Sequence, residues 1–253
     1  MMSHRLIRAC AFASALVFAN TAAAIDVEEV KTRDGITAYL ARDDSNPIIA
    51  FSFEFRGGSS LDPDEKLGLS TMAAGLLDEG SGDLDSFAFQ SKLQDLAIKL
   101  SFNANTDSFS GSLTTIKANA DEAFALMAQA LSAPRFDDEP VERIRRQILV
   151  SLARGAENPG RIARDTLFEE IFPDHPYGRP SSGTPETIQA ITQADLSAFT
   201  AERFAKDRLF VGVAGDISPR QLRKRLGQVF GHLPDTVATE WRVADTAVTY
   251  VGT

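Results

Sequence analysis

Two histidines beyond the first few residues, His175 and His232, are the side chains best suited to hold a catalytic metal. Zinc hydrolysis needs about three nitrogen or carboxylate ligands on fixed elements and a carboxylate base for the bound water. The two histidines stand in separate turn-like segments, and no helical pattern carries a histidine pair. We therefore interpret His175 as a turn residue and His232 as an exposed helix end. The sequence predicts no metal site.

Other patterns that could do chemistry lack essential members. No Gly-x-Ser-x-Gly elbow supports a serine nucleophile, and the Gly-Gly-Ser-Ser run at residues 57–60 lacks the Gly-Lys-Ser/Thr ending of a phosphate-binding loop. Residues 62–65 offer three carboxylates, but without the spacing of an EF-hand calcium loop. We interpret residues 57–60 as a turn, and Asp62 with Pro63 as the loop that leads into the next helix.

The first 24 residues follow the order of regions typical of a secretory signal peptide. Arg5 and Arg8 precede an apolar run at residues 9–19, and small residues follow before an acidic segment. The run is shorter than the roughly 20 residues that a membrane-spanning helix needs, so we expect residues 1–24 to be cleaved and no membrane span. Cys10, the only cysteine, lies in this segment. The exported chain would then have no disulfide, no thiol nucleophile and no thiolate metal site.

Charge and composition restrict the partners and the domain organisation. The chain has 26 basic and 35 acidic residues and a net charge of −9, which argues against duplex nucleic acid as a partner. Because the sequence shows no linker, low-complexity tract or repeat of 20–50 residues, it predicts one domain over residues 25–235. Residues 236–253 are interpreted as the start of a linker or of a next extended segment, in a chain that continues.

Apolar periodicity predicts the elements that would position any site. Alternating or clustered apolar residues indicate strands at residues 27–31, 36–41, 48–56, 100–104, 109–115 and 209–214. The first two flank residues 33–35, which end in a glycine, and the fourth and fifth flank residues 105–107. Both arrangements are typical of hairpins.

Helical periods fall between and after these strands. Leu69, Met72, Ala73, Leu76 and Leu77 have the spacing of one buried helix stripe, and the glycine-containing residues 79–83 should end that helix. Further helices are expected around residues 89–96 and at residues 120–131, 141–154, 159–172 (with Asn158 as N-cap), 184–191, 194–204 and 220–230. Strands and helices come in groups, so the sequence predicts an α+β fold with a mainly antiparallel sheet.

Five strings, in this order and spacing, resemble the pitrilysin/insulinase family of zinc peptidases, in the bacterial branch related to the mitochondrial processing peptidase. The strings are residues 55–59, 67–69, 102–106, 175–180 with 183–184, and 213–216. The resemblance covers nearly all of residues 27–231. It implies one half-unit of the two-unit clamshell that family members form.

The resemblance also implies that the metal ligands are missing. Active members carry His-x-x-Glu-His on the helix after Gly-Leu and a further glutamate about 75 residues later. These positions fall at Thr71, Ala74 and Gly75, with the distal glutamate near Ser151. Thr71, Ala74, Gly75 and Asp78 share the helix face away from the core stripe, so we expect a free face without ligands.

Family members bind substrate by adding an extended peptide to an edge strand, which requires free backbone groups more than special side chains. The matching strand is residues 99–105. We expect Leu100, Phe102 and Ala104 on its core side and Ser101, Asn103 and Asn105 on the other. The resemblance assigns peptide contact to Phe102, Asn103, Ala104 and Asn105, with Asn103 and Ala104 foremost. An ordinary hairpin strand is the alternative.

These implications give one leading hypothesis and two rivals. The leading one is a non-catalytic, peptide-binding subunit of a periplasmic heterodimeric zinc metallopeptidase, exported by residues 1–24, with no cofactor of its own and with zinc in a catalytic partner of the same family. A rival is a scaffold or binding protein that keeps the peptidase fold without a proteolytic partner, as the core proteins of the cytochrome bc1 complex do. The other rival is an active zinc peptidase whose ligands lie outside this segment.

Overall fold

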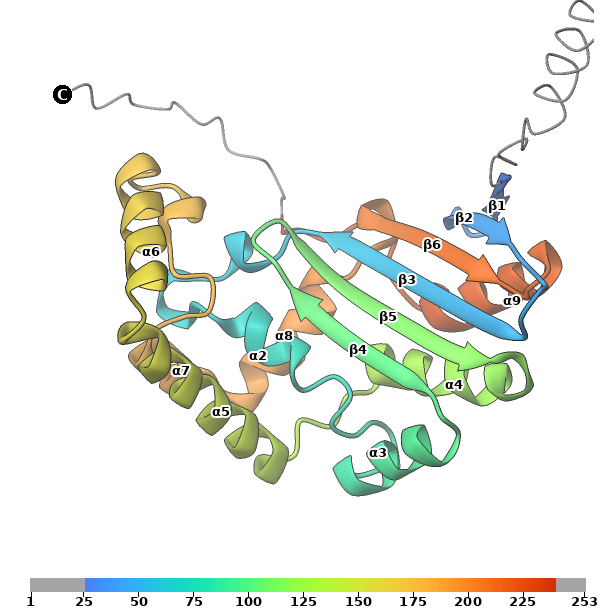
Figure 1. The fold of residues 1–253 in the computed structure, drawn as a ribbon, viewed down its shortest axis with the longest axis horizontal. Coiled ribbons are helices and arrows are strands. Elements are labelled where there is room, and N and C mark those ends of the chain that lie inside the picture. The colour runs from blue at the N-terminus through green and yellow to red at the C-terminus, as the bar shows by residue number, and fades with distance from the viewer. Residues whose placement is uncertain (1–25, 240–253) are drawn as a thin grey trace, which may run out of the picture.

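A computed structural model describes residues 26–239, in which a six-stranded sheet is packed against helices (Figure 1). The strands are β1 (Val27–Lys31), β2 (Thr37–Arg42), β3 (Ile48–Arg56), β4 (Lys99–Ala104), β5 (Ser108–Ile116) and β6 (Leu209–Gly215). Their order across the sheet is β1-β2-β6-β3-β5-β4. Only the β2–β6 pair is parallel, so the predicted mainly antiparallel α+β fold is confirmed.

The described residues also form α-helices and short 3-10 turns. The α-helices are α2 (Leu69–Ala74), α3 (Ser86–Asp95), α4 (Ala120–Ser132), α5 (Asp138–Ala156), α6 (Pro159–Ile171), α7 (Pro185–Ala190), α8 (Gln193–Arg203) and α9 (Pro219–Phe230). The 3-10 turns are η1 (Ser59–Leu61), η2 (Asp64–Lys66), η3 (Lys117–Asn119), η4 (Pro176–Gly178) and η5 (Lys206–Arg208). The signal-peptide prediction for residues 1–24, and residues 240–253 of the predicted C-terminal segment, lie outside the described residues.

One face of the sheet is buried against helices and the other is open. Along β3 the residues alternate between exposed and buried, as a period of two requires, and Phe51, Phe53 and Phe55 are on the buried side. The ring of Phe51 lies 5.2 Å from that of Phe124 in α4 and 6.1 Å from that of Phe230 in α9. The hydrophobic core therefore lies between the sheet and its helix layer.

Helix starts follow local signals that the sequence displays. Asn158 caps α6, as predicted, by accepting a hydrogen bond from the Arg161 N–H at 3.1 Å. Thr192 and Ser218 open α8 and α9 with reciprocal capping boxes. These caps explain why the predicted helix ranges lie close to the observed ones.

The helix that carries the predicted ligand positions is shorter than expected. Helix α2 ends at Ala74, with Gly75 as its C-cap, and the chain continues in turns through Glu79. Leu76 and Leu77 are buried even so, because the turns keep the apolar side chains against the core. The sequence pattern therefore predicted the burial correctly and the helix end wrongly.

Helices α5 and α6 extend away from the sheet, at the edge of the molecule opposite β1 and α9 (Figure 1). Helix α6 has no buried residue, and its Ile162, Leu167 and Phe168 are exposed. Within residues 26–239, no helix is both long enough and apolar enough to cross a membrane.

Candidate functional site

The four positions that the resemblance assigns to metal chemistry lie on α2, its C-cap and α5, and none has a metal-binding side chain. The Thr71 hydroxyl donates a hydrogen bond to the Ser181 carbonyl at 3.3 Å. Ala74 is 7 % exposed and belongs to the core, so the prediction that it lies on a free face is wrong. Met72 and Ala73 of the same helix are buried in the core beside it.

Helix α5 passes along the C-terminal end of α2. An added Cβ on Gly75 would lie 3.2 Å from Cγ2 of Ile144, and Arg143 donates to Glu79 at 2.5 Å. Ser151 lies eight residues after Arg143, two turns along the same face of α5, and it is exposed. Ser151, the position expected for the distal glutamate, is therefore exposed to solvent. It lies on the same side of α5 as Arg143, which contacts the segment after α2.

The structure places each histidine in a local turn or at a helix end. His175 accepts a hydrogen bond at Nδ1 from the Tyr177 N–H at 3.1 Å and caps η4, and His232 is exposed just after α9. Both placements confirm the predicted turn and helix-end positions. Over residues 26–239, no group of three or more histidine, cysteine, aspartate or glutamate side chains is arranged to hold a metal ion.

Strand β4 is an edge strand of the sheet, as the predicted peptide-binding role requires. Leu100 is buried and Phe102 and Ala104 pack partly against the core, whereas Ser101 and Asn103 are exposed. The two predicted faces of this strand are therefore confirmed.

The hydrogen-bond register shows which backbone groups of β4 point outward. The Asn105 N–H donates to the Ser108 carbonyl at 2.8 Å, and antiparallel pairs alternate between hydrogen-bonded and non-hydrogen-bonded. Asn103, opposite Ser110, is therefore also hydrogen-bonded to β5. The N–H and C=O groups of Phe102 and Ala104 point to the free edge, where no other described segment hydrogen-bonds them.

The four predicted peptide-contact residues thus lie together but can act in two different ways. Phe102 and Ala104 can offer backbone groups at the edge. Asn103 and Asn105 can offer only side chains, which are joined by a 3.1 Å hydrogen bond from Nδ2 of Asn103 to Oδ1 of Asn105. Phe102 and Asn103 also border a shallow hollow of about 470 Å³ on the open face of the sheet. Peptide contact itself stays a prediction.

The β4–β5 hairpin is held in place by the loop that the sequence suggested was a simple turn. The N–H groups of Gly57, Ser59 and Ser60 donate to the carbonyls of Asp107, Asn105 and Thr106, at 2.6, 2.9 and 2.9 Å. An added Cβ on Gly58 would lie 1.9 Å from the Asn105 carbonyl oxygen. The close backbone approach therefore requires glycine at position 58.

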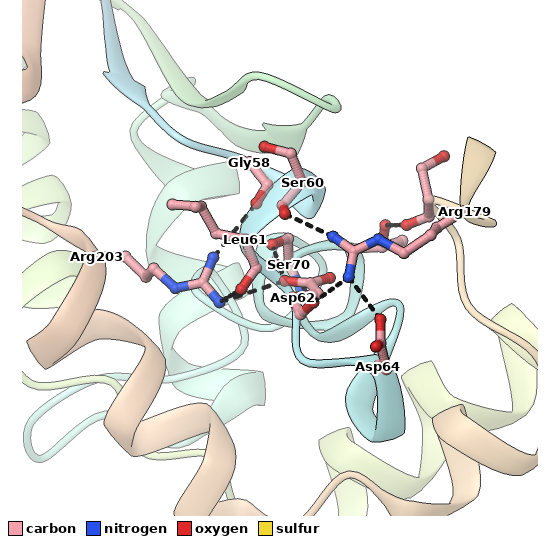
Figure 2. A network of polar contacts seen from close by, with 10 residues as sticks. Gly58, Ser60, Leu61, Asp62, Asp64, Ser70, Arg179 and Arg203 are labelled. Carbon is pink, nitrogen blue, oxygen red and sulfur yellow. Dashed lines mark hydrogen bonds and ion pairs between the residues drawn. The ribbon is translucent and has the colours of Figure 1, made fainter. Parts of the chain in front are cut away.

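A buried ionic network also holds this loop in place (Figure 2). Asp62, which is 2 % exposed, accepts hydrogen bonds from the Ser70 hydroxyl at 2.5 Å and the Ser70 N–H at 3.1 Å. Arg203 of α8 donates to the carbonyls of Gly58 and Leu61 at 3.3 and 2.7 Å, and lies 3.6 Å from Oδ1 of Asp62. Burial raises the pKa of Asp62, although Ser70 and Arg203 oppose this shift. Asp62 therefore shapes the loop before α2, as predicted.

A second arginine extends the network to the segment after η4. Arg179 donates to the Asp62 carbonyl at 3.1 Å, to Oδ1 of Asp64 at 2.7 Å and to the Ser60 carbonyl at 2.6 Å (Figure 2). The Tyr177 hydroxyl lies 3.0 Å from both carboxylate oxygens of Asp107 in the hairpin turn. Residues 175–180 thus stabilise the loop and the hairpin turn through hydrogen bonds. The sequence did not predict these contacts.

Sequence reasoning also missed a larger cavity beside the hairpin turn. It has a volume of about 630 Å³ and lies between the turn, α6 and the segment after η4, lined in part by Asp107, Arg161, Phe168, Tyr177 and Ser181. Because the Ser181 carbonyl accepts a hydrogen bond from the Thr71 hydroxyl, the cavity adjoins one of the four positions that the resemblance assigns to metal chemistry. No sequence spacing brings residues 107, 168 and 181 together, so only the fold could reveal it.

Asp78, near the end of the α2 region, is a mostly buried carboxyl group. Burial, with a smaller contribution from the neighbouring Glu79 carboxylate, raises the pKa of Asp78 to about 6. Glu79 is the carboxylate that Arg143 pairs with directly, at 2.5 Å. The charged form of Asp78 is therefore destabilised by burial. Arg143 forms an ion pair with Glu79 and not with Asp78.

Comparison with known proteins finds a matching family, related proteins and similar solved structures. The family description "Insulinase (Peptidase family M16)" matches residues 38–185. A Helicobacter pylori protein described as "Non-peptidase homolog YmxG" is 32 % identical over 194 residues, which are 77 % of this chain and 45 % of that protein.

Two solved structures share the fold. The inactive domain of an M16 peptidase from Pseudomonas fluorescens matches with a TM-score of 0.80 and 26 % identity, over 85 % of this chain and 53 % of that one. The periplasmic protease PqqL from Escherichia coli matches with a TM-score of 0.75 over 87 % of this chain and 25 % of that one, and its 15 % identity shows the fold alone. The chain thus spans about half, or less, of the length of these relatives.

Proposed function

The chain belongs to the insulinase family of peptidases, family M16, and we propose that it acts there as a non-catalytic, peptide-binding subunit beside a zinc-bearing peptidase subunit. One observation carries the proposal. The ligand positions Thr71, Ala74, Gly75 and Ser151 hold no metal-binding side chain, while the edge strand β4 next to α2 is intact. The side chains for zinc chemistry are missing from these positions, while the fold keeps the free sheet edge that the proposed peptide binding would use.

Peptide binding would use backbone pairing along β4. An extended segment beside the strand can exchange hydrogen bonds with the outward N–H and C=O groups of Phe102 and Ala104, an interaction that depends little on peptide sequence. The exposed side chains of Asn103 and Asn105 would add contacts from the open face of the sheet. The network through Arg203 and Arg179 supports this role, because it holds the loop whose N–H groups bond the hairpin in one position.

The proposal also includes a catalytic partner and a location. The name "Non-peptidase homolog" of one relative and the inactive M16 domain of another favour a division of labour, in which zinc belongs to a second chain of the same family. The signal-like residues 1–24 favour the periplasm, the compartment named for PqqL. A tagged chain, purified from its source, should bring with it a protein that contains His-x-x-Glu-His. Its absence would favour the scaffold function instead.

The absence of catalysis is tested on the exported chain purified alone. We expect no bound zinc by atomic absorption and no cleavage of quenched fluorescent peptides above the blank rate. Stoichiometric zinc, together with turnover that a chelator abolishes, would contradict the proposal.

Peptide binding at β4 is tested by removing one outward hydrogen-bond donor. Ala104→Pro deletes an N–H that faces the free edge, a position where proline is tolerated in edge strands. We expect peptide affinity to fall about tenfold in fluorescence anisotropy, with little loss of stability, because about one backbone hydrogen bond is removed. Ala104→Val keeps the N–H and is the matched control, so equal affinities of the two variants would rule out pairing at this edge.

A further inference from the structure

The solvent face of α5 carries a regular stripe of two arginines with an apolar residue between them. Arg146, Val150 and Arg154 are spaced four residues apart, so they lie above one another on the helix, and all three are exposed. They border a shallow surface hollow of about 500 Å³ that is also lined by Arg143, Gln147 and Ser151. The stripe adjoins Ser151, the empty distal position.

These two arginines differ from the other arginines in the middle of the same helix. Arg143 is paired with Glu79, and Arg145 with Glu142 at 2.9 Å. Within residues 26–239, Arg146 and Arg154 have no hydrogen bond or ion pair with any side chain or backbone group other than the helix itself. Their guanidinium groups are therefore available to an external ligand.

The charge of the stripe is opposite to that of the protein as a whole. The chain has a net charge of −9, yet only Glu157 is acidic among residues 143–164, which contain six arginines. Guanidinium groups bind carboxylates with two parallel hydrogen bonds. A local positive surface on an acidic protein therefore suits an acidic ligand.

We propose that the Arg146–Val150–Arg154 stripe binds an acidic, extended peptide segment, with one carboxylate on each arginine; this deepens, and rests on, the proposed peptide-binding function. Eight helical residues rise about 12 Å, and four residues of an extended chain rise about 13 Å. Two carboxylates four residues apart therefore match the two arginines. The side chain midway between them lies on the same side of the peptide and meets Val150.

The expected recognition pattern is thus acidic-x-apolar-x-acidic. A fluorescein-labelled peptide of eleven residues with a central Glu-Ser-Leu-Ser-Glu is the probe, and the same peptide with Gln-Ser-Leu-Ser-Gln is its uncharged counterpart. Anisotropy titrations with the full exported chain at low salt should show the glutamate peptide binding about tenfold more tightly. Raising the ionic strength should reduce this preference, because exposed charges are screened.

The double variant Arg146→Gln/Arg154→Gln should lose the preference for glutamate, so that both peptides bind with the affinity of the glutamine peptide. The matched control is Arg220→Gln/Arg223→Gln, which makes the same change in net charge at two exposed positions of α9. The control should keep the full preference. Equal thermal unfolding midpoints for both double variants would show that the fold is unaffected.

Other outcomes separate this inference from the proposed function. Equal binding of both peptides, each weakened by Ala104→Pro, would overturn the arginine stripe and leave peptide binding at β4 in place. A glutamate preference that survives Arg146→Gln/Arg154→Gln would also overturn the stripe, because the carboxylates would then bind elsewhere. Failure of both peptides to bind would overturn the two proposals together.

Discussion

Arginine serves opposite purposes in the loop at residues 57–64 and on the solvent face of α5. Around the loop, Arg179 and Arg203 donate hydrogen bonds to its backbone carbonyls and lie beside its carboxylates, and Arg203 is only 6 % exposed. On α5, Arg146 and Arg154 are exposed and have no partner among the described residues. The same side chain is structural where the fold surrounds it and available for binding where the fold leaves it in water.

The two kinds of arginine differ in the groups that would lose a hydrogen-bond partner if the arginine were removed. A buried carbonyl or carboxylate that loses its donor keeps the full desolvation cost, whereas water replaces an exposed guanidinium group at little cost. The bonded loop can therefore position the β4–β5 hairpin. The exposed arginines of α5 can be replaced with little loss of stability.

Replacement of Arg203 should have the largest effect on stability. Arg203→Ala leaves Asp62 buried without its cation and the carbonyls of Gly58 and Leu61 without a donor, so we expect a loss of about 3–5 kcal/mol in the free energy of unfolding. Urea denaturation measures this loss. Arg146→Ala is the control and should change stability by less than about 0.5 kcal/mol. Similar losses of unfolding free energy for the two variants would show that the arginines of the two regions do not differ in their structural role.

Asp78 tests whether burial without a direct cation is costly near the end of α2. Its folded pKa of about 6 lies above the ordinary value of 3.8 for an aspartate, so the charged form is disfavoured in the folded state. The penalty is absent below pH of about 4, develops as the pH rises to about 6, and then stays near 2–3 kcal/mol.

Asp78→Asn should therefore stabilise the protein by about 2–3 kcal/mol at pH 7.5 and by little near pH 4. Urea denaturation of both proteins across this range measures the difference. A gain that is the same at both pH values would show that the charge of Asp78 is not its cause.

The smallest effect is expected at the contact between η4 and the hairpin turn. Tyr177→Phe removes the hydroxyl that donates to Asp107 and keeps the ring packed 5.6 Å from Phe172 and 4.7 Å from His175. We expect a loss of about 1 kcal/mol in thermal or urea unfolding. A loss as large as that of Arg203→Ala would show that this contact is as important for stability as the network around residues 57–64. No loss would show that the contact does not contribute to stability.

The elements were predictable because their signals are local. Alternation along residues 48–56 specifies one buried face of β3, and Asn158 caps α6 through a bond to a residue three positions on. The end of α2 was not predictable in this way. The apolar stripe continues through Leu77, but the helix stops at Gly75, which lies directly against Ile144 of α5.

By itself, the sequence determined that no histidine or glutamate stands at Thr71, Ala74, Gly75 and Ser151, the positions that the resemblance assigns to metal chemistry, because a side chain that is not encoded cannot be supplied by folding. It also indicated which face of β4 is buried, since alternation is a property of the strand alone. Only the tertiary structure decided that β4 lies at the sheet edge with Phe102 and Ala104 presenting free backbone groups. Likewise, it decided which arginines find partners, because an ion pair between residues as far apart as Asp62 and Arg203 exists only once the chain has brought them together.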